Sequence, residues 1–183
     1  MEKVVLITGS SKGIGKATAI EFAKIGGYKV VINYLTDKEN AEKLSNYLKE
    51  KYKIETLVIK TDISNEEQVK NMIQEVINKF GRIDVLVNNA GIAIDKEFED
   101  RTVEDWKRTL EVNTIGTFLV SKYASENMLK NKSGKIINVS STNGINTFFP
   151  SSIDYDASKA AIINLTYNLA IQFSPYINVN AVA

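Results

Sequence analysis

The chain has 183 residues, of which 44% are hydrophobic and 25% are charged, a composition typical of one soluble globular domain. Its 23 basic and 22 acidic side chains nearly cancel, so charge gives no support to nucleic acid or an anionic membrane as the main partner. The absence of cysteine and histidine excludes disulfides, thiolate nucleophiles, Ser-His-Asp triads and metal sites built from these ligands, and we expect no metal. Catalysis must therefore use tyrosine, lysine, serine, asparagine or carboxylates.

The absence of cysteine favours a cytoplasmic protein, and the N-terminus supports this prediction. Charged Glu2 and Lys3 precede an apolar run that is too short for the hydrophobic region of a signal peptide or for a membrane span.

In the first half of the chain, short β-branched runs alternate with longer amphipathic segments. The pattern predicts, in order, a strand at 4–7, a helix ending near residue 24, a strand at 29–34, a helix at 38–51, a strand at 56–60 and a helix at 66–80. We expect Asn65 to cap the last of these helices, ahead of an acidic first turn.

The second half repeats this alternation. It predicts a strand at 83–87, a long helical region at 103–131, a strand at 135–139, a helix at 155–173 and a strand at 177–182. Strands that are apolar throughout and alternate with helices indicate a parallel sheet covered on both faces. We therefore predict a single doubly wound α/β domain over residues 1–183, with its ligands at the carboxyl ends of the strands.

A glycine-rich turn, TGSSKGIG at 8–15, joins the first predicted strand to the first helix. Glycines permit a tight turn and let backbone N–H groups at the helix N-terminus approach a pyrophosphate. The turn is not a phosphate-binding P-loop, because Ala17 stands where Mg²⁺ needs a hydroxyl and Ser10 replaces the first glycine. Its spacing also differs from the usual Gly-x-Gly-x-x-Gly fingerprint.

Tyr155 and Lys159 are four residues apart near the start of a predicted helix, so their side chains point the same way. A nearby ammonium favours the phenolate form of a tyrosine, whose ordinary pKa of about 10 is too high for proton transfer at neutral pH. Such a pair can act as general acid toward a carbonyl oxygen or as base toward an alcohol. The hydride must come from a cofactor, since no side chain supplies one.

These motifs, in this order, resemble those of the short-chain dehydrogenases/reductases. The resemblance rests on the glycine turn, on Asn-Asn-Ala-Gly at 88–91 after the fourth strand, and on the Tyr155–Lys159 pair. It implies a Rossmann-type fold with helices on both faces and a nicotinamide-dependent oxidoreductase. The implied catalytic residues are Asn113, which would position a water for proton relay, Ser141 (or Ser140), which would bind the substrate oxygen, Tyr155, and Lys159, which would also hold the ribose hydroxyls.

The same resemblance implies a set of cofactor contacts. They come from the glycine turn, the ends of three strands and the catalytic pair: Gly9, Ser11, Lys12, Gly13, Ile14, Gly15, Asn33, Tyr34, Asp62, Ile63, Asn89, Ala90, Gly91, Tyr155 and Lys159. Asp62 would bind the adenine amino group and Ile63 would pack on its ring.

The second strand favours NADP(H) over NAD(H). Enzymes that use NAD usually carry an acid at the end of this strand for the ribose 2′-hydroxyl, whereas here no acid occurs before Asp37. Lys12 stands where NADP-dependent relatives carry a basic residue for the 2′-phosphate. We expect NADP(H), with NAD(H) as the alternative.

The segments at 33–34, 91–95 and 178–183 resemble 3-oxoacyl-acyl-carrier-protein reductases of fatty acid biosynthesis. This implies an acyl-thioester substrate and an acidic carrier protein that Lys130, Lys132 and Lys135 could meet, while Phe148 and Phe149 suggest an apolar wall near the catalytic serine. Alcohol, sugar or steroid dehydrogenases of the family are the alternative, followed by a non-catalytic cofactor-binding sensor.

Family members continue past the sixth strand with a substrate-covering loop, another helix and a last strand, whereas this sequence ends at Ala183. The resemblance implies a homo-tetramer at full length, and low stability and little activity for the 183 residues alone.

Overall fold

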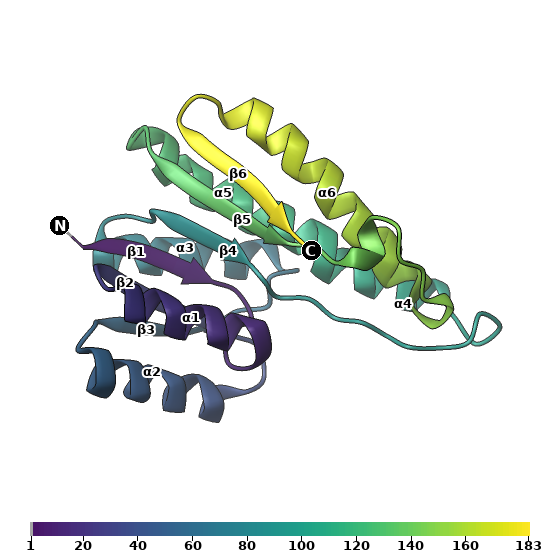
Figure 1. Cartoon of the computed structure of the whole chain (residues 1–183), viewed down its shortest axis with the longest axis horizontal. Helices are drawn as coiled ribbons and strands as arrows, with labels where there is room; N and C mark the ends of the chain where they lie inside the picture. The colour runs from purple at the N-terminus through teal and green to yellow at the C-terminus, as the bar shows by residue number, and fades with distance from the viewer. Residues whose placement is uncertain (1) are drawn as a thin grey trace.

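The computed structural model describes residues 2–183 and is built on a parallel sheet with strand order β3-β2-β1-β4-β5-β6 (Figure 1). The strands are β1 (Lys3–Ile7), β2 (Tyr28–Tyr34), β3 (Thr56–Lys60), β4 (Val85–Asn88), β5 (Gly134–Val139) and β6 (Ile177–Val182). Since the order reverses between β1 and β4, the topological switch point lies between these two strands. The predicted doubly wound α/β fold is confirmed.

Helices cover the sheet in two layers. They are α1 (Gly13–Ile25), α2 (Lys38–Tyr52), α3 (Glu66–Phe80), α4 (Val103–Leu110), α5 (Thr117–Lys130) and α6 (Ile153–Phe173), with a π-helix η1 (Glu111–Gly116) and two short 3₁₀ turns, η2 (Thr142–Gly144) and η3 (Pro150–Ser152). Helices α1 and α2 pack on one face, and α3, α5 and α6 pack on the other.

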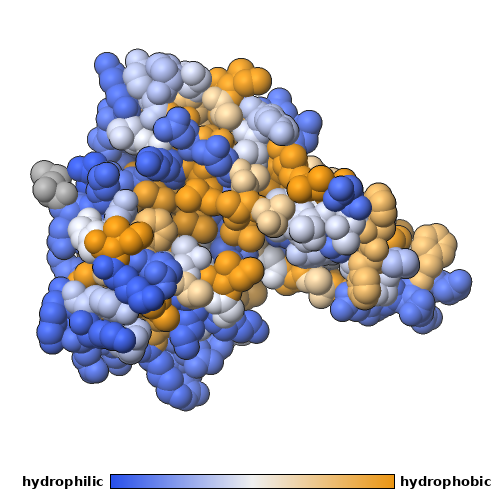
Figure 2. Space-filling view, in the orientation of Figure 1, coloured by the Kyte–Doolittle hydropathy of each residue, from blue (hydrophilic) through white to orange (hydrophobic). Residues whose placement is uncertain are grey.

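The central strand β1 is apolar throughout because both of its faces are buried. Val5 and Ile7 pack toward α1 and α2, whereas Val4 and Leu6 pack into the core under α3, α5 and α6. On the α1 side the cover is partial at β5, where Ile137 and Val139 are only half-buried. Figure 2 shows apolar residues gathered over the middle of this face, between more hydrophilic helices.

Several element boundaries differ from those predicted. Strand β4 begins at Val85 rather than at residue 83, because the backbone N–H of Ile83 donates to Asn127 instead of continuing the ladder. Helix α6 begins two residues early, at Ile153, directly after the 3₁₀ turn that starts at Pro150.

The predicted long helical region at 103–131 is confirmed, and it contains a π-helical segment, η1, between α4 and α5. At this wider turn the side chain of Asn113 is fully buried and bonds to the backbone of Ile92 at 2.8 and 2.9 Å. Gly116 closes the turn against Ile63, where a Cβ would come within 2.8 Å of a side-chain carbon.

Helix capping follows the sequence more closely. Asn65 caps α3 as predicted, since its side chain accepts a hydrogen bond from the Gln68 amide at 3.0 Å.

Among residues 2–183, no helix combines the length and the apolarity needed to cross a membrane.

Candidate active site

Two adjoining cavities open at the carboxyl ends of the strands. One, of about 370 Å³, lies at the ends of β1, β2 and β3, and the other, of about 550 Å³, lies beside β5 and the start of α6. Both are lined by Asn89, Gly91 and Ile92, so they form one cleft across the switch point between β1 and β4. This is where the sheet topology predicts a ligand.

The glycine turn is locked against the segment after β4. Gly9 has a φ of +61°, and a Cβ there would lie 2.8 Å from the Ala90 Cα. A Cβ at Gly15 would lie 2.7 Å from the Gly9 carbonyl oxygen. Gly9 and Gly15 thus allow a close approach of backbone segments that a side chain would prevent, which fits a turn that must also leave room for a ligand.

Thr8, which sequence reasoning did not select, holds these two segments together. Its hydroxyl oxygen accepts hydrogen bonds from the amides of Asn89 and Ala90, both at 3.0 Å. The Asn89 side chain in turn donates hydrogen bonds to the carbonyls of Thr8 and Gly9 at 2.9 and 3.0 Å. The sequence signal was present, since Thr8 directly precedes the first glycine of the turn.

The N-terminus of α1 is suited to an anion. Helices α2, α3 and α4 are capped by the side chains of Asp37, Asn65 and Thr102, whereas Lys12 at the start of α1 provides no side-chain cap. The first turn of α1 also has no acidic residue. Uncapped N–H groups and the positive end of the helix dipole together favour a phosphate group.

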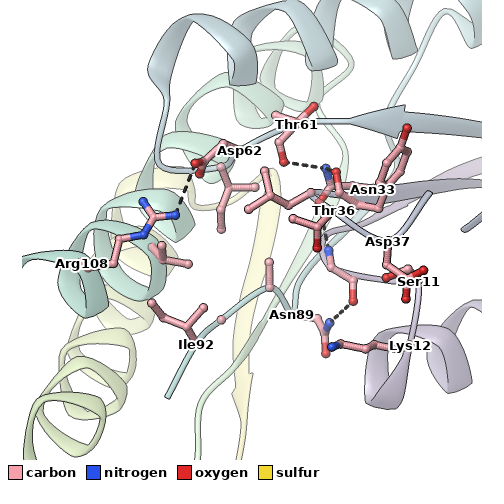
Figure 3. Close-up of a pocket in the computed structure, with 17 residues that line it drawn as sticks. Ser11, Lys12, Asn33, Thr36, Asp37, Thr61, Asp62, Asn89, Ile92 and Arg108 are labelled. Atoms are coloured by element: carbon pink, nitrogen blue, oxygen red, sulfur yellow. Dashed lines mark hydrogen bonds and ion pairs between the residues drawn. The ribbon is translucent and has the colours of Figure 1, made fainter. Parts of the chain in front are cut away.

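The far end of the cleft is formed by β2, β3 and α4 (Figure 3). Asn33 is buried, and its side-chain oxygen accepts a hydrogen bond from the Gly9 amide at 3.0 Å, so it shapes the turn from behind. Tyr34 and Ile63 also line this cavity. Arg108 of α4 lies across it from Asn33 and was not selected from the sequence.

Asp62 is ionised in this end of the cleft. Burial opposes its charge, but the hydroxyl and amide of Ser64, at 2.6 and 2.9 Å, and the Arg108 guanidinium at 3.4 Å hold the pKa of Asp62 below its ordinary 3.8. An acceptor of this kind fits the amino group of an adenine, which donates hydrogen bonds.

Ser141, Tyr155 and Lys159 line the cavity beside β5 and α6, so the structure brings these three predicted residues together. Lys159 is 4% exposed, and its Nζ donates to the Val139 carbonyl at 2.7 Å and lies 5.5 Å from the centre of the Tyr155 ring. Burial lowers the pKa of Lys159 from 10.5 to about 8.

The geometry separates the two candidate serines. The Ser140 hydroxyl is buried and donates to the Lys159 carbonyl at 2.9 Å, so its hydrogen is already used. The Ser141 side chain is half-exposed, and its oxygen accepts from the Asn143 amide at 3.2 Å. Ser141 therefore keeps a hydroxyl hydrogen available for a ligand, whereas Ser140 does not.

Asn113 lies behind the cleft and is not part of its lining. Besides its two bonds to Ile92, its amide donates at 2.9 Å to Ser158, whose hydroxyl donates to the Tyr155 carbonyl at 2.7 Å. Its side chain thus ties the cofactor-side wall to the helix that carries Tyr155.

Most residues predicted to contact the cofactor from the glycine turn and from the segment after β4 line the cleft: Gly9, Ser11, Lys12, Ile14, Ala90 and Gly91. Gly13 and Gly15 belong to the turn but line neither cavity.

Other residues singled out in the sequence lie away from the cleft. Phe148 and Phe149 are exposed on the loop before α6 and do not form the expected wall. Lys130, Lys132 and Lys135 lie at the amino end of β5, at the opposite end of the sheet from the cleft.

Comparison with known proteins agrees with this arrangement. The sequence profile of the short chain dehydrogenase family matches residues 3–183, and the chain belongs to this family. It is 40% identical over 187 residues to a 3-oxoacyl-[acyl-carrier-protein] reductase from Synechocystis, covering 99% of this chain and 72% of that protein. It is 37% identical over 174 residues to an uncharacterized oxidoreductase from Thermotoga maritima, covering 95% of this chain and 66% of that protein.

Solved structures of the family superpose closely. An NAD⁺-bound xylitol dehydrogenase matches with a TM-score of 0.93 at 34% identity, covering 99% of this chain and 69% of that one. ElxO with NADP bound matches with a TM-score of 0.91 at 40% identity, covering 100% of this chain and 73% of that one. The chain thus spans about two thirds to three quarters of the length of these relatives.

Proposed function

We propose that this chain forms the cofactor-binding and catalytic part of an NADP(H)-dependent reductase that converts a carbonyl to an alcohol, with Tyr155 as the general acid. The observation that carries the proposal is that Ser141, Tyr155 and Lys159 line one continuous cleft with the glycine turn. A chain without histidine has few other groups for this proton transfer.

Each side chain has a distinct task in this mechanism. The Ser141 hydroxyl donates a hydrogen bond to the substrate oxygen and orients it toward Tyr155, whose phenol delivers the proton. The Lys159 ammonium stabilises negative charge on the phenolic oxygen as the proton leaves. Val139, by accepting from Lys159, fixes the direction of the ammonium. Asn113 and Ser158 hold the backbone at Tyr155 in place.

The cleft fits a nicotinamide dinucleotide, which supplies the hydride when bound. The uncapped start of α1 would hold the pyrophosphate, Asp62 and Ile63 the adenine, and Lys159 the ribose hydroxyls.

The preference for NADP(H) is supported by two side chains at the mouth of the cleft (Figure 3). Lys12 is exposed within the glycine turn and makes no ion pair within residues 2–183, so it is available to a 2′-phosphate. Asp37, the acid nearest to β2, is occupied as the cap of α2, since its two oxygens accept from the amide and the side chain of Asn40 at 3.2 and 2.9 Å. These bonds hold its pKa below 3.8.

A 3-oxoacyl thioester is our proposed substrate, and an acyl carrier protein the proposed partner, because the Synechocystis relative carries that name at 40% identity. The alternative is a sugar or other alcohol dehydrogenase, which the match to a xylitol dehydrogenase at a TM-score of 0.93 supports.

The decisive assay follows NADPH and NADH oxidation by absorbance with an acetoacetyl thioester, a diketone and a ketose as substrates. We expect turnover of the thioester with NADPH. Tyr155→Phe should reduce kcat by roughly 10²- to 10⁴-fold and leave cofactor binding largely intact, because only one hydroxyl of the cofactor-contacting set is removed. Tyr167→Phe, an exposed tyrosine on the same helix, is the matched control and should keep full activity.

Turnover that survives in Tyr155→Phe would exclude the proposed mechanism. Cofactor binding by the wild-type protein without turnover of any substrate would favour a sensor.

A further inference from the structure

Arg101 and Asp154 form an ion pair inside the protein, close to the cleft but outside its lining. Arg101 lies in the loop between β4 and α4, and Asp154 lies in the first turn of α6, 53 residues further along the chain. Arg101 Nη1 and Asp154 Oδ1 are 2.5 Å apart, and the two side chains are 2% and 0% exposed. Both charges are thus removed from water.

The guanidinium also holds backbone on two different loops. Its Nη2 donates to the carbonyls of Ile94 and Lys96, at 2.9 and 3.2 Å, in the loop after β4. The same nitrogen donates to the carbonyl of Ser151, at 2.5 Å, in the turn before α6. The Lys96 amide bonds directly to that Ser151 carbonyl at 3.0 Å, and Figure 1 shows the two loops running side by side beyond the sheet.

Asp154 extends the network to a third element. Its second carboxylate oxygen accepts a hydrogen bond from the buried Thr109 hydroxyl of α4 at 2.7 Å. The pair therefore joins α4, α6 and the loop after β4 at a single point.

These contacts connect the two sides of the catalytic cavity. The loop that Arg101 holds begins with Ile92 and Ala93, which line the cavity on its cofactor side. Asp154 is the residue directly before Tyr155, which lines the opposite side. Any change in the spacing of the two loops therefore moves the phenol relative to the wall it faces.

Stability alone does not account for this arrangement. The attraction within a buried ion pair roughly offsets the cost of removing both charges from water. Apolar residues of similar volume at the same positions often stabilise the folded state equally well. Within residues 2–183 the pair also leaves the buried Arg101 Nε without a partner. The Arg101 guanidinium binds three carbonyls and a carboxylate at fixed positions, which apolar residues cannot do.

We propose that Arg101 and Asp154 are a positioning pair that fixes Tyr155 at its working distance from the cofactor side of the cleft. This role rests on the proposed function of Tyr155 as the proton donor. The pair should therefore control kcat but leave cofactor affinity unchanged, because within residues 2–183 its hydrogen bonds and ion pair reach neither the glycine turn nor α1.

The test compares wild type, Asp154→Asn, and the double variant Arg101→Met/Asp154→Asn. The single variant leaves a buried guanidinium without its counter-charge, so we expect a lower Tm and a lower kcat. The double variant removes that charge and should recover most of the lost Tm. Its kcat should stay roughly ten- to a hundredfold below wild type while the KM for NADPH is unchanged. Recovery of kcat together with Tm would overturn the proposal.

Hydrogen exchange provides a readout that does not depend on turnover. In the double variant, amides in residues 92–100 and 150–157 should exchange faster together, with the glycine turn unchanged. Unchanged exchange in both segments would also overturn the proposal. Arg82→Met is the matched control, because Arg82 pairs with Asp84 at 2.5 Å at the amino end of β4, and it should affect neither exchange segment nor kcat.

Wild-type protein that binds NADPH without turning over any substrate would refute the proposed function, and the exchange result would still decide whether the pair joins the two loops.

Discussion

Lys159 carries its charge in surroundings that oppose it. Its side chain is almost fully buried, a carbonyl oxygen is its hydrogen-bond partner, and no carboxylate contributes to the shift of its pKa to about 8. The cost of burying this ammonium is therefore part of the free energy of folding, and it depends on pH.

This cost predicts how stability changes with pH. The pKa of Lys159 is about 8 in the folded protein and near 10.5 in the unfolded chain, so between these values the unfolded chain holds more protons. The free energy of unfolding of wild type, measured relative to Lys159→Met, should therefore rise as pH increases from 8 to 10.5 and stay level below 8. Denaturant titrations of both proteins at intervals of pH check this. A constant difference across the whole range would show that burial does not shift the lysine.

At the scale of elements, the N-terminus of α1 has no side-chain cap, and its Lys12 makes no ion pair within residues 2–183. Helices α2 and α4 have side-chain caps, and α6, which has none, carries Asp154 and Asp156 in its first turn. The first turn of α1 has neither a side-chain cap nor an acidic residue, so its N–H groups and Lys12 are available to an anion. In the proposed function, the helix end would bind the pyrophosphate of either dinucleotide, and Lys12 would favour NADP(H).

We therefore expect Lys12→Ala to weaken NADPH binding about tenfold, equivalent to roughly 1.4 kcal/mol, and to leave NADH affinity almost unchanged. The reason is that only NADPH carries the 2′-phosphate. Dissociation constants from calorimetry measure both effects, and Lys16→Ala, one turn along α1, is the control. Equal weakening of the two cofactors would instead assign Lys12 to the shared pyrophosphate.

At the scale of the whole molecule, a chain of buried polar side chains runs across β4 and β5 on the face of the sheet that α5 and α6 cover. Asn88 of β4 donates to Ser121 of α5 and to Asn138 of β5, both at 2.9 Å. Asn138 in turn donates to Thr166 of α6 at 2.9 Å. These bonds link both helices to the strands that end in the cleft, although within residues 2–183 the buried Asn88 Oδ1 has no partner of its own.

Removing the middle of this chain should lower stability. Asn138→Ala leaves buried groups on Asn88 and Thr166 with fewer partners, and we expect a loss of roughly 1–3 kcal/mol in the free energy of unfolding. Asn168→Ala, an exposed asparagine on α6, should change it by less than about 0.5 kcal/mol. Denaturant unfolding of both variants provides the comparison, and losses of equal size would argue against the role of the buried chain.

The sequence by itself determined the order and type of the main elements, the parallel sheet and the motifs of the cleft. These follow from local signals: apolar runs at 4–7 and 135–139, glycine in the turn, Asn65 as a cap, and the four-residue spacing of Tyr155 and Lys159. It did not reveal the π-helical segment η1 or the hydrogen-bond partners of Thr8, because each depends on contacts with distant segments.

Only the tertiary structure decided which selected residues face the ligand and which act from behind. It placed Asn113 behind the cleft, bonded Asn33 of the lining to the Gly9 amide, left Phe148 and Phe149 outside the cleft, and brought Arg101 to Asp154. The physical reason is that a pattern along the chain specifies which side of an element is buried. The partner that each buried polar group finds is set by how the elements pack, and that is not written in any one segment.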